Sequence, residues 1–468
     1  MTGCVTIDVL PDDVLLEIFD FYVDEALLDF KIEGWHTLVH VSRKWRCVVF
    51  DSPLRLNLQL LCSASTPVRE TLNIWPPLPI IIQGRSLSTS IEDNIIAAFE
   101  HPDRICEVEL TGVPSSLLVK LLPAMQEPFP VLTHMRLETK DNTVPVIPGS
   151  FLGGFAPHLG DLSLRGIPIP FPGLRNLLWS TTDLVSLILY KIPHSGYFSP
   201  EAMVTCLSAL TRLQVLFVGF ESPRSRPYRE NRHPPPPTRT LLPSLRDLWF
   251  TGVNEYLEDL VARIDTPLLS DLSMALFHQL IFETPQLAQF ISRNSPRQKN
   301  EAPDEAHITF SDLKVMILLP RPFQYGLKST ISCSQSDWQL SALAQACSSS
   351  FPHASISTVE HLYIVEDKYQ RPHWQDDIEK GQWLEVLHPF TAVKSLFLSQ
   401  EFAARIAPAL QELVWERANE VLPALESIFL EGLDSSGVVP EGIGQFVTAQ
   451  HLSGYLIDVI PWTRRDGR

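Results

Sequence analysis

The chain has 468 residues, of which 45% are hydrophobic and 19% are charged, so it contains enough apolar material for a buried core. At about 150 residues per domain, this length predicts about three domains or one long repeat array. Thirty-seven Lys and Arg residues stand against 54 Asp and Glu, and the net charge of −17 excludes nucleic acid as the main partner, because phosphate binding needs a cationic surface.

Residues 10–23, LPDDVLLEIFDFYV, predict the first helix. Pro11 suits the first helical position, where its missing N–H group costs nothing. Asp12 and Asp13 lie at the positive end of the helix dipole. The apolar residues recur at helical spacing and form one stripe: Val14, Leu15, Ile18, Phe19 and Tyr22.

A second helical pattern runs from Leu38 to Val49 and ends near Pro53. Its apolar residues fall on one helical face: Leu38, Val41, Trp45, Val48 and Val49. A module of this size cannot bury two apolar stripes by itself. We therefore expect the N-terminal helices to complete their core against another protein.

These residues resemble an F-box. The run LPDDVLLEIF at 10–19 is followed by Leu38, by VSRKWR at 41–46 and by SPL at 52–54, in the order found in that family. The resemblance covers residues 6–55 and implies a small all-α module that binds the Skp-type adaptor of an SCF (Skp–cullin–F-box) ubiquitin ligase. It places six residues in the adaptor contact: Leu10, Pro11, Leu15, Ile18, Val41 and Trp45. The alternative is an unrelated helical cap on the rest of the chain.

Residues 56–104 are expected to connect this module to the remainder and to form its N-terminal cap. Prolines at 76, 77 and 79 predict a stiff turn, and Ile80–Ile82 predict a short strand after it. Glu92 to Phe99 is expected to be a helix.

From residue 105 a triplet of apolar residues recurs, with two residues and then one residue between its members. The triplets begin 24 to 32 residues apart, at positions 105, 132, 159, 184, 213, 245 and 269, and return at 359, 393 and 425. The alternation within each triplet predicts a short strand with one buried face. We expect one degraded copy near Phe310–Leu319.

Amphipathic helices are predicted between the triplets. Ser199, Pro200 and Glu201 provide a cap, a first-turn proline and an acid for one of them. Asn254 to Ile264 predicts a second helix, and Ser336 with Gln339 predicts a capping box for a third.

Strands and helices alternating with this period are typical of leucine-rich repeats. The predicted fold class is therefore α/β: an all-α F-box followed, over residues 105–433, by an irregular leucine-rich-repeat solenoid with a parallel sheet on its concave face and helices outside. An F-box joined to degenerate repeats resembles a class of fungal F-box proteins. An ordinary mixed α/β domain is the alternative for the repeat region.

The concave face should present the residues between the last two members of each triplet: Ser163, Ile188, Phe217, Trp249, Ser273, Tyr363, Phe397 and Phe429. Residues 221–240, rich in proline and arginine, predict a solvated loop between two repeats. Residues 434–468 are expected to form a C-terminal cap and tail.

Patterns that would indicate catalysis are missing from the sequence. It contains no GxxxxGK[ST], GxGxxG, GxSxG, CxxC or HExxH motif, so we predict no catalytic residue, metal or cofactor. The seven scattered cysteines suit a reducing compartment. No apolar run reaches the ~18–20 residues of a membrane helix, and the N-terminus lacks the basic start of a secretory signal.

The resemblance implies the function and the partners. The chain is expected to be the non-catalytic substrate-recognition subunit of an SCF-type ligase in the cytoplasm, the nucleus or both, with a Skp-type adaptor, cullin through that adaptor, and a target protein as partners. The alternative is a repeat-based binding scaffold whose F-box acts outside ubiquitin transfer. Neither a membrane nor a nucleic acid is expected as a partner.

Overall fold

The computed structural model divides into two compact units, Met1–Tyr197 and Phe198–Arg468, which are described separately below. It describes residues 10–28, 34–53, 55–56, 58–63, 68–85, 92–141, 145–227, 238–277, 284–294, 303–321, 324–333, 335–374, 380–412, 421–433 and 439–464. The centre of the predicted proline- and arginine-rich loop, 228–237, lies outside these residues, as do 434–438 and 465–468 of the C-terminal segment.

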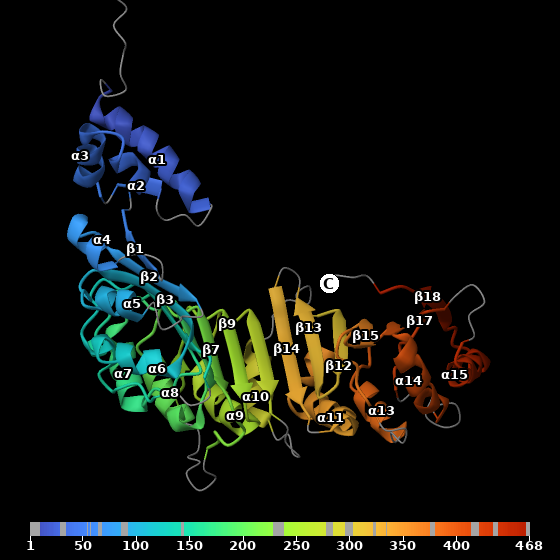
Figure 1. Cartoon of the computed structure of the whole chain (residues 1–468). Coiled ribbons are helices and arrows are strands. Elements are labelled where there is room, and N and C mark those ends of the chain that lie inside the picture. Colours follow the sequence, from blue (N-terminus) through green and yellow to red (C-terminus); the bar gives the residue numbers. More distant parts are fainter. Residues whose placement is uncertain are drawn as a thin grey trace, which may run out of the picture. The chain divides into compact units, whose positions relative to one another are not determined.

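Three helices begin the first unit: α1 (Asp12–Leu28), α2 (Gly34–Val39) and α3 (Arg43–Asp51) (Figure 1). The predicted helical pattern over 38–49 is broken between α2 and α3. The reason is a new cap, because Ser42 is extended and its side chain accepts a hydrogen bond from the Trp45 backbone N–H at 3.2 Å. Val41 therefore lies in the turn and does not share a helical face with Trp45.

The helices complete their core against residues of their own chain. Leu15 and Phe19 of α1 are fully buried, in one cluster with Trp35 and with leucines of the connector. Trp35 donates its indole N–H to the Gln59 carbonyl at 3.0 Å and lies 5.3 Å from the Trp75 ring. Leu56, Leu58, Leu60 and Leu78 of the same chain thus contribute to this core, whereas the sequence pattern predicted that another protein completes it.

The rest of the first unit is a parallel sheet whose strands follow the order of the chain. The strands are β1 (Leu60–Ser63), β2 (Ile80–Arg85), β3 (Ile105–Val113), β4 (His134–Thr139), β5 (Asp161–Arg165) and β6 (Ser186–Ile192). The helices are α4 (Val68–Ile74), α5 (Glu92–Phe99), α6 (Ser115–Leu121) and α7 (Phe171–Ser180), with 3-10 turns at Ala124–Gln126, Phe151–Gly154 and His194–Gly196.

The predicted triplets set the register of this sheet. Residues in the middle of successive triplets pair with one another and are buried in one row: Val108, Met135, Leu162 and Leu187, preceded by Ile82 of β2. Each fully buried aliphatic side chain stabilises the fold by about 1.5–3 kcal/mol, so the row forms a continuous core beneath the helices. The strand at 80–85 and the helix Glu92–Phe99 lie where the sequence predicted them.

The second unit begins with the same alternation of helices and strands. Its first elements are α8 (Pro200–Leu207), β7 (Val215–Phe220), β8 (Thr240–Leu241), β9 (Asp247–Gly252), α9 (Asn254–Val261), β10 (Ile264–Asp265), β11 (Asp271–Leu276) and α10 (Pro285–Asn294). The predicted cap of α8 is confirmed, because the Ser199 hydroxyl oxygen accepts from the Ala202 N–H at 3.2 Å. Strands β7, β9 and β11 are parallel neighbours, and β8 pairs with β10 in a small separate sheet.

Between residues 303 and 333 the chain folds back on itself. In place of the single degraded copy predicted near Phe310–Leu319, three strands occur: β12 (Glu305–Ser311), β13 (Lys314–Arg321) and β14 (Gln324–Ser332). Strand β14 is parallel to β11, β13 is antiparallel to both β14 and β12, and β12 is parallel to the following repeat (Figure 1). Short turns join antiparallel strands without a crossover helix, which is why the helical period is absent here.

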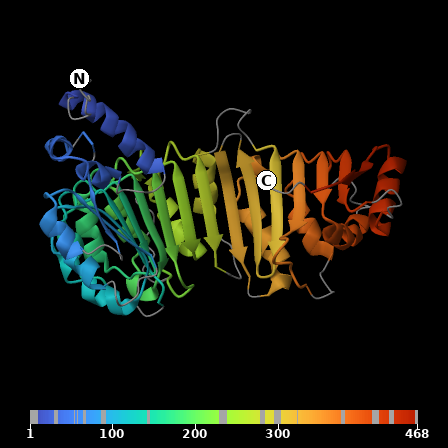
Figure 2. The same cartoon turned by 45° about the horizontal axis from the view of Figure 1, so that its top comes forward.

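Regular alternation returns after the fold-back. The elements are a 3-10 turn (Ser336–Trp338), α11 (Gln339–Ser349), α12 (His353–Ile356), β15 (His361–Glu366), α13 (Lys380–Leu387), β16 (Ser395–Leu398), α14 (Gln400–Glu412), β17 (Ser427–Glu431), α15 (Glu441–Leu452) and β18 (Asp458–Trp462). Figure 2 shows the strands of this part side by side. The segment expected as a cap and tail thus contains a further strand, since β18 is parallel to β17.

The predicted capping box of Ser336 and Gln339 is wrong. The Ser336 hydroxyl donates to the Asp312 carbonyl at 2.7 Å, and the Gln339 amide donates to the Ser311 carbonyl at 2.6 Å. Both side chains therefore hold the β12–β13 turn, which the sequence pattern did not reveal.

Candidate functional site

The structure separates the six predicted adaptor-binding residues into two groups. Leu15 and Trp45 are 0% and 8% exposed and belong to the core of the helical module, so in this conformation they cannot form a contact surface. Leu10 is partly buried against that core, whereas Pro11, Ile18 and Val41 are exposed. Leu15 and Trp45 therefore position the helices, and the accessible surface is formed by the other four residues.

An apolar stripe remains uncovered on α1. Val14, Ile18 and Phe21 are spaced by four and three residues, which places them on one side of the helix. Their exposed fractions are 39%, 39% and 77%, and that of Val41 in the turn after α2 is 53%. We call these four residues the exposed helical stripe. Val14 and Phe21 were not among the predicted contact residues, although the helical spacing alone places them beside Ile18.

Ion pairs fix the orientation of α1. Lys44 donates to the Leu10 carbonyl at 2.5 Å and lies 3.5 Å from the Asp12 carboxylate. Arg55 contacts Asp20 at 2.9 Å and Glu17 at 3.1 Å, and these bonds raise the pKa of its guanidinium. Lys44 thus connects the start of α1 to α3, Arg55 connects the middle of α1 to the segment after α3, and Pro11 stays exposed.

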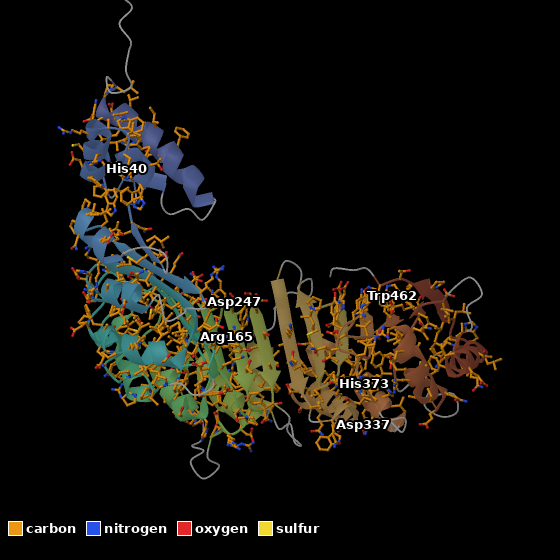
Figure 3. All side chains as sticks on the ribbon, viewed as in Figure 1. His40, Arg165, Asp247, Asp337, His373 and Trp462 are labelled. Atoms are coloured by element: carbon orange, nitrogen blue, oxygen red, sulfur yellow. The ribbon has the colours of Figure 1, made fainter. Side chains whose placement is uncertain are left out.

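The sheet face of the first unit that is opposite its core row carries charges that pair with one another. Arg136 lies 3.7 Å from Glu109, Arg165 lies 3.3 Å from Glu138, and the Arg165 guanidinium is 5.0 Å from the centre of the Tyr190 ring (Figure 3). Beside them is a hollow of about 380 Å³, lined by residues that include Glu107, His134, His158 and Asp161.

The same face of the second unit is aromatic. His307, Tyr363, Phe397 and Phe429 occupy one register row across β12, β15, β16 and β17. Their ring centres are 4.4, 4.2 and 4.3 Å apart, with interplanar angles of 3°, 13° and 12°. We call these four residues the aromatic row. All four are only partly buried.

Carboxylates line one side of the aromatic row. Asp304, Glu360 and Glu426 directly precede β12, β15 and β17, and Lys394 precedes β16, which lies between β15 and β17. Backbone hydrogen bonds of 2.8 to 2.9 Å link these four residues. Glu305 and Asp458 start β12 and β18. We call these the acidic edge: Asp304, Glu305, Glu360, Glu426 and Asp458. Burial and the charges of Glu305 and Asp304 raise the pKa of the Tyr363 hydroxyl.

The predicted concave-face positions are partly or fully exposed, as expected. Tyr363, Phe397 and Phe429 came from the triplet pattern, whereas His307 and Trp462 were missed because they lie in the fold-back and in the segment expected as a tail. The alternation of polar and apolar residues over 305–310 was a signal that could have found His307.

Chemistry-bearing residues do not converge in the described part of the chain. No group of three or more His, Cys, Asp or Glu residues could hold a metal ion there. Burial raises the pKa of Cys62, Cys106 and Cys333 to about 11, so these thiols stay protonated at neutral pH and are poor nucleophiles. Of the described helices, none is both long and apolar enough to pass through a lipid bilayer.

The chain is similar to solved structures of other proteins. No protein-family model and no curated protein matches the sequence. The crystal structure of the leucine-rich repeat-containing protein LegL7 from Legionella pneumophila is similar over 85% of this chain and 98% of that chain, with 13% sequence identity and a TM-score of 0.28. The repeat character rests on this chain's own topology: strands at the predicted triplets in a mainly parallel sheet, with helices between them, as in leucine-rich-repeat scaffolds.

Proposed function

We propose that this chain is the non-catalytic target-recognition subunit of an SCF-type ubiquitin ligase, with an F-box over residues 6–55. The observation that carries the proposal is the exposed helical stripe on a module whose own core is already complete. An apolar stripe that folding leaves in water indicates a surface for another protein.

The proposed partner of this surface is inferred from the sequence motifs beside it. The stripe starts three residues after the Leu10–Pro11 corner, which is where the resemblance to an F-box places the Skp-type adaptor. Each exposed apolar side chain that the adaptor covers would contribute about 25 cal/mol for every Å² of apolar surface removed from water.

The repeats would receive the target protein. Their sheet faces are open and carry aromatic and charged side chains, as in repeat proteins that bind partners along an extended surface. In this role the chain makes and breaks no covalent bond. It raises the rate of ubiquitin transfer by holding the target near the ligase, in the cytoplasm, the nucleus or both.

The test is co-purification of the full chain with a Skp-type adaptor. Ile18→Asp combined with Val41→Asp places two charges in the exposed helical stripe and is expected to abolish adaptor binding. Because both side chains are exposed, the circular dichroism and the melting temperature should stay close to those of the unchanged protein.

The matched control is Val119→Asp combined with Val131→Asp. These valines are 55% and 39% exposed, like Val41 and Ile18, and lie in the repeat region of the same unit. The control should retain the adaptor. Retention of the adaptor by both variants would contradict the assignment of this surface.

The alternative is a binding scaffold whose F-box serves an adaptor complex without ubiquitin transfer. Cullin should co-elute with the chain and the adaptor if the chain works in a ligase. A stable complex with the adaptor that never retains cullin would favour the scaffold.

A further inference from the structure

The aromatic row presents ring edges to solvent. Its rings stack nearly parallel at 4.2 to 4.4 Å, so each inner ring has both faces covered by its neighbours. A ligand on this surface therefore contacts a band of apolar edges that crosses the strands, and aliphatic groups suit such a band.

The acidic edge runs parallel to this band. Glu305 and Asp458 lie two residues before the row along their strands, which is about 6.6 Å away. A lysine or arginine spans this distance when its aliphatic stem lies on apolar surface and its charged head extends beyond it.

Among the described residues, the acidic edge has fewer ion-pair partners than carboxylates. Lys394 pairs with Glu360 at 2.9 Å, and His307 pairs with Glu305 at 3.2 Å. Within the described part of the chain, Asp304, Glu426 and Asp458 have no ion-pair partner within 4.0 Å. The first unit differs, because Glu109 and Glu138 on its sheet face are both within reach of arginines.

The chain places one arginine of its own across the C-terminal end of this face. Trp462 is the last residue of β18 (labelled in Figure 3), and its ring centre lies 5.5 Å from that of Phe397. Arg464 then donates to the Glu366 carbonyl of β15 at 2.8 Å. A tryptophan and an arginine of this chain therefore lie on one margin of the surface, and the described residues place no equivalent pair at the acidic edge on the other margin.

We propose that the aromatic row and the acidic edge together bind an extended polypeptide segment in which lysine or arginine alternates with apolar residues. The apolar residues and the stems of the basic residues cover the ring edges, and the ammonium or guanidinium groups pair with the acidic edge. This inference rests on the proposed function in one respect: it takes the second unit as the part of the chain that binds the target protein.

The experiment measures the fluorescence anisotropy of a labelled dodecapeptide in which arginine and valine alternate, titrated with the full-length chain. Peptides with glutamate or glutamine in place of arginine are the comparison. The arginine peptide should bind, its Kd should rise with salt, and the glutamate peptide should not bind. Equal binding of the arginine and glutamate peptides, or no binding of either, would overturn the proposal.

A charge-removing variant locates the site. Glu305→Gln combined with Asp458→Asn should weaken binding of the arginine peptide by about tenfold, since it removes two exposed charge contacts. The control is Glu107→Gln combined with Asp161→Asn, which removes two carboxylates from the sheet face of the first unit. The control should bind like the unchanged chain, and an equal loss in both variants would mean that only the overall negative charge attracts the peptide.

Adaptor binding by the same proteins separates this inference from the proposed function. Loss of peptide binding with the adaptor retained would refute only the basic-segment receptor. Peptide binding by a chain that never binds the adaptor would support the receptor and refute the ligase role.

Discussion

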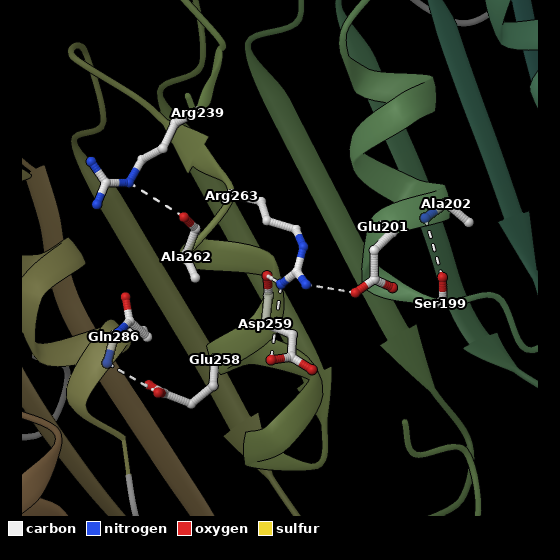
Figure 4. A network of polar contacts seen from close by, with 9 residues as sticks. All are labelled: Ser199, Glu201, Ala202, Arg239, Glu258, Asp259, Ala262, Arg263 and Gln286. Carbon is white, nitrogen blue, oxygen red and sulfur yellow. Dashed lines mark hydrogen bonds and ion pairs between the residues drawn. The ribbon is translucent and has the colours of Figure 1, made fainter. Parts of the chain in front are cut away.

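Glu258 and Arg263 are two charged residues buried in the second unit, and each is paired with backbone groups or with an opposite charge. Glu258 of α9 is 6% exposed, and its carboxylate accepts from the backbone N–H groups of Gln286 at 3.0 Å and Leu287 at 2.6 Å. Arg263 pairs with Glu201 at 2.7 Å and donates to the Asp259 carbonyl at 2.6 Å (Figure 4). These residues tie α8, α9 and α10 together, because each pairing joins groups that would be costly to bury alone.

Glu258→Gln is expected to lower the free energy of unfolding by about 1–3 kcal/mol, since it weakens two hydrogen bonds and removes a negative charge at the start of a helix. Chemical denaturation followed by tryptophan fluorescence measures the change. Glu221→Gln, at an exposed position, should stay within about 0.5 kcal/mol of the unchanged protein. Identical transitions for both variants would show that the carboxylate does not stabilise α10.

Asp247 makes stability depend on pH. Burial, a hydrogen bond to Asp271 and the charge of Asp271 raise the pKa of Asp247 from 3.8 to about 6. Between these two values the folded chain keeps a proton that the unfolded chain has released, so the stabilising contribution is present at low pH and is lost as pH rises through about 6.

Asp247→Asn keeps a hydrogen-bond donor and cannot titrate. The melting temperature of the variant relative to the unchanged protein is therefore expected to rise between about pH 4 and pH 6. Thermal unfolding across this range checks the slope. If the melting temperatures of the variant and the unchanged protein differ by the same amount at every pH, the Asp247–Asp271 pair does not contribute to the pH dependence.

At the scale of elements, the last two long helices of the second unit, α14 and α15, pack closely against each other. Gly442 lies in the first turn of α15, where a Cβ atom would come within 2.6 Å of the Ala407 carbonyl oxygen of α14. Gly444, two residues later, faces open space. A side chain at position 442 would therefore clash with α14, whereas a side chain at position 444 has room.

Gly442→Ala is expected to destabilise the second unit, because α15 must move away from α14. Gly444→Ala should raise the stability by up to about 1 kcal/mol, since alanine favours the helix over glycine. The two melting temperatures, compared with that of the unchanged protein, test this pair. A gain in both variants would mean that α15 does not pack closely on α14.

At the scale of the whole molecule, the described residues form three different surfaces, one on the N-terminal helices and two on the sheet faces of the repeats. The exposed helical stripe is apolar, the sheet face of the first unit carries charges that neutralise one another, and that of the second unit is aromatic with an acidic edge. The strands need only their alternate, buried residues to form the core, so the outward residues are free to differ between units.

The sequence by itself determined most of the secondary structure. Each complete triplet became a strand, and the helices near residues 92 and 200 begin where the sequence predicted them. The helix predicted over Asn254–Ile264 begins at Asn254 but ends at Val261, and Ile264 lies in β10. These features are local, because alternation along a strand and capping of a helix involve residues only a few positions apart.

Only the tertiary structure decided which apolar residues became surface and which rings came together. Leu15 and Ile18 look alike in the sequence, but Leu15 belongs to the core that α1 forms with α2 and α3, whereas Ile18 lies on the exposed side of α1. The aromatic row unites β12 with β15 only because the chain folds back through two antiparallel strands. Such pairings depend on contacts between distant segments, and no local pattern contains them.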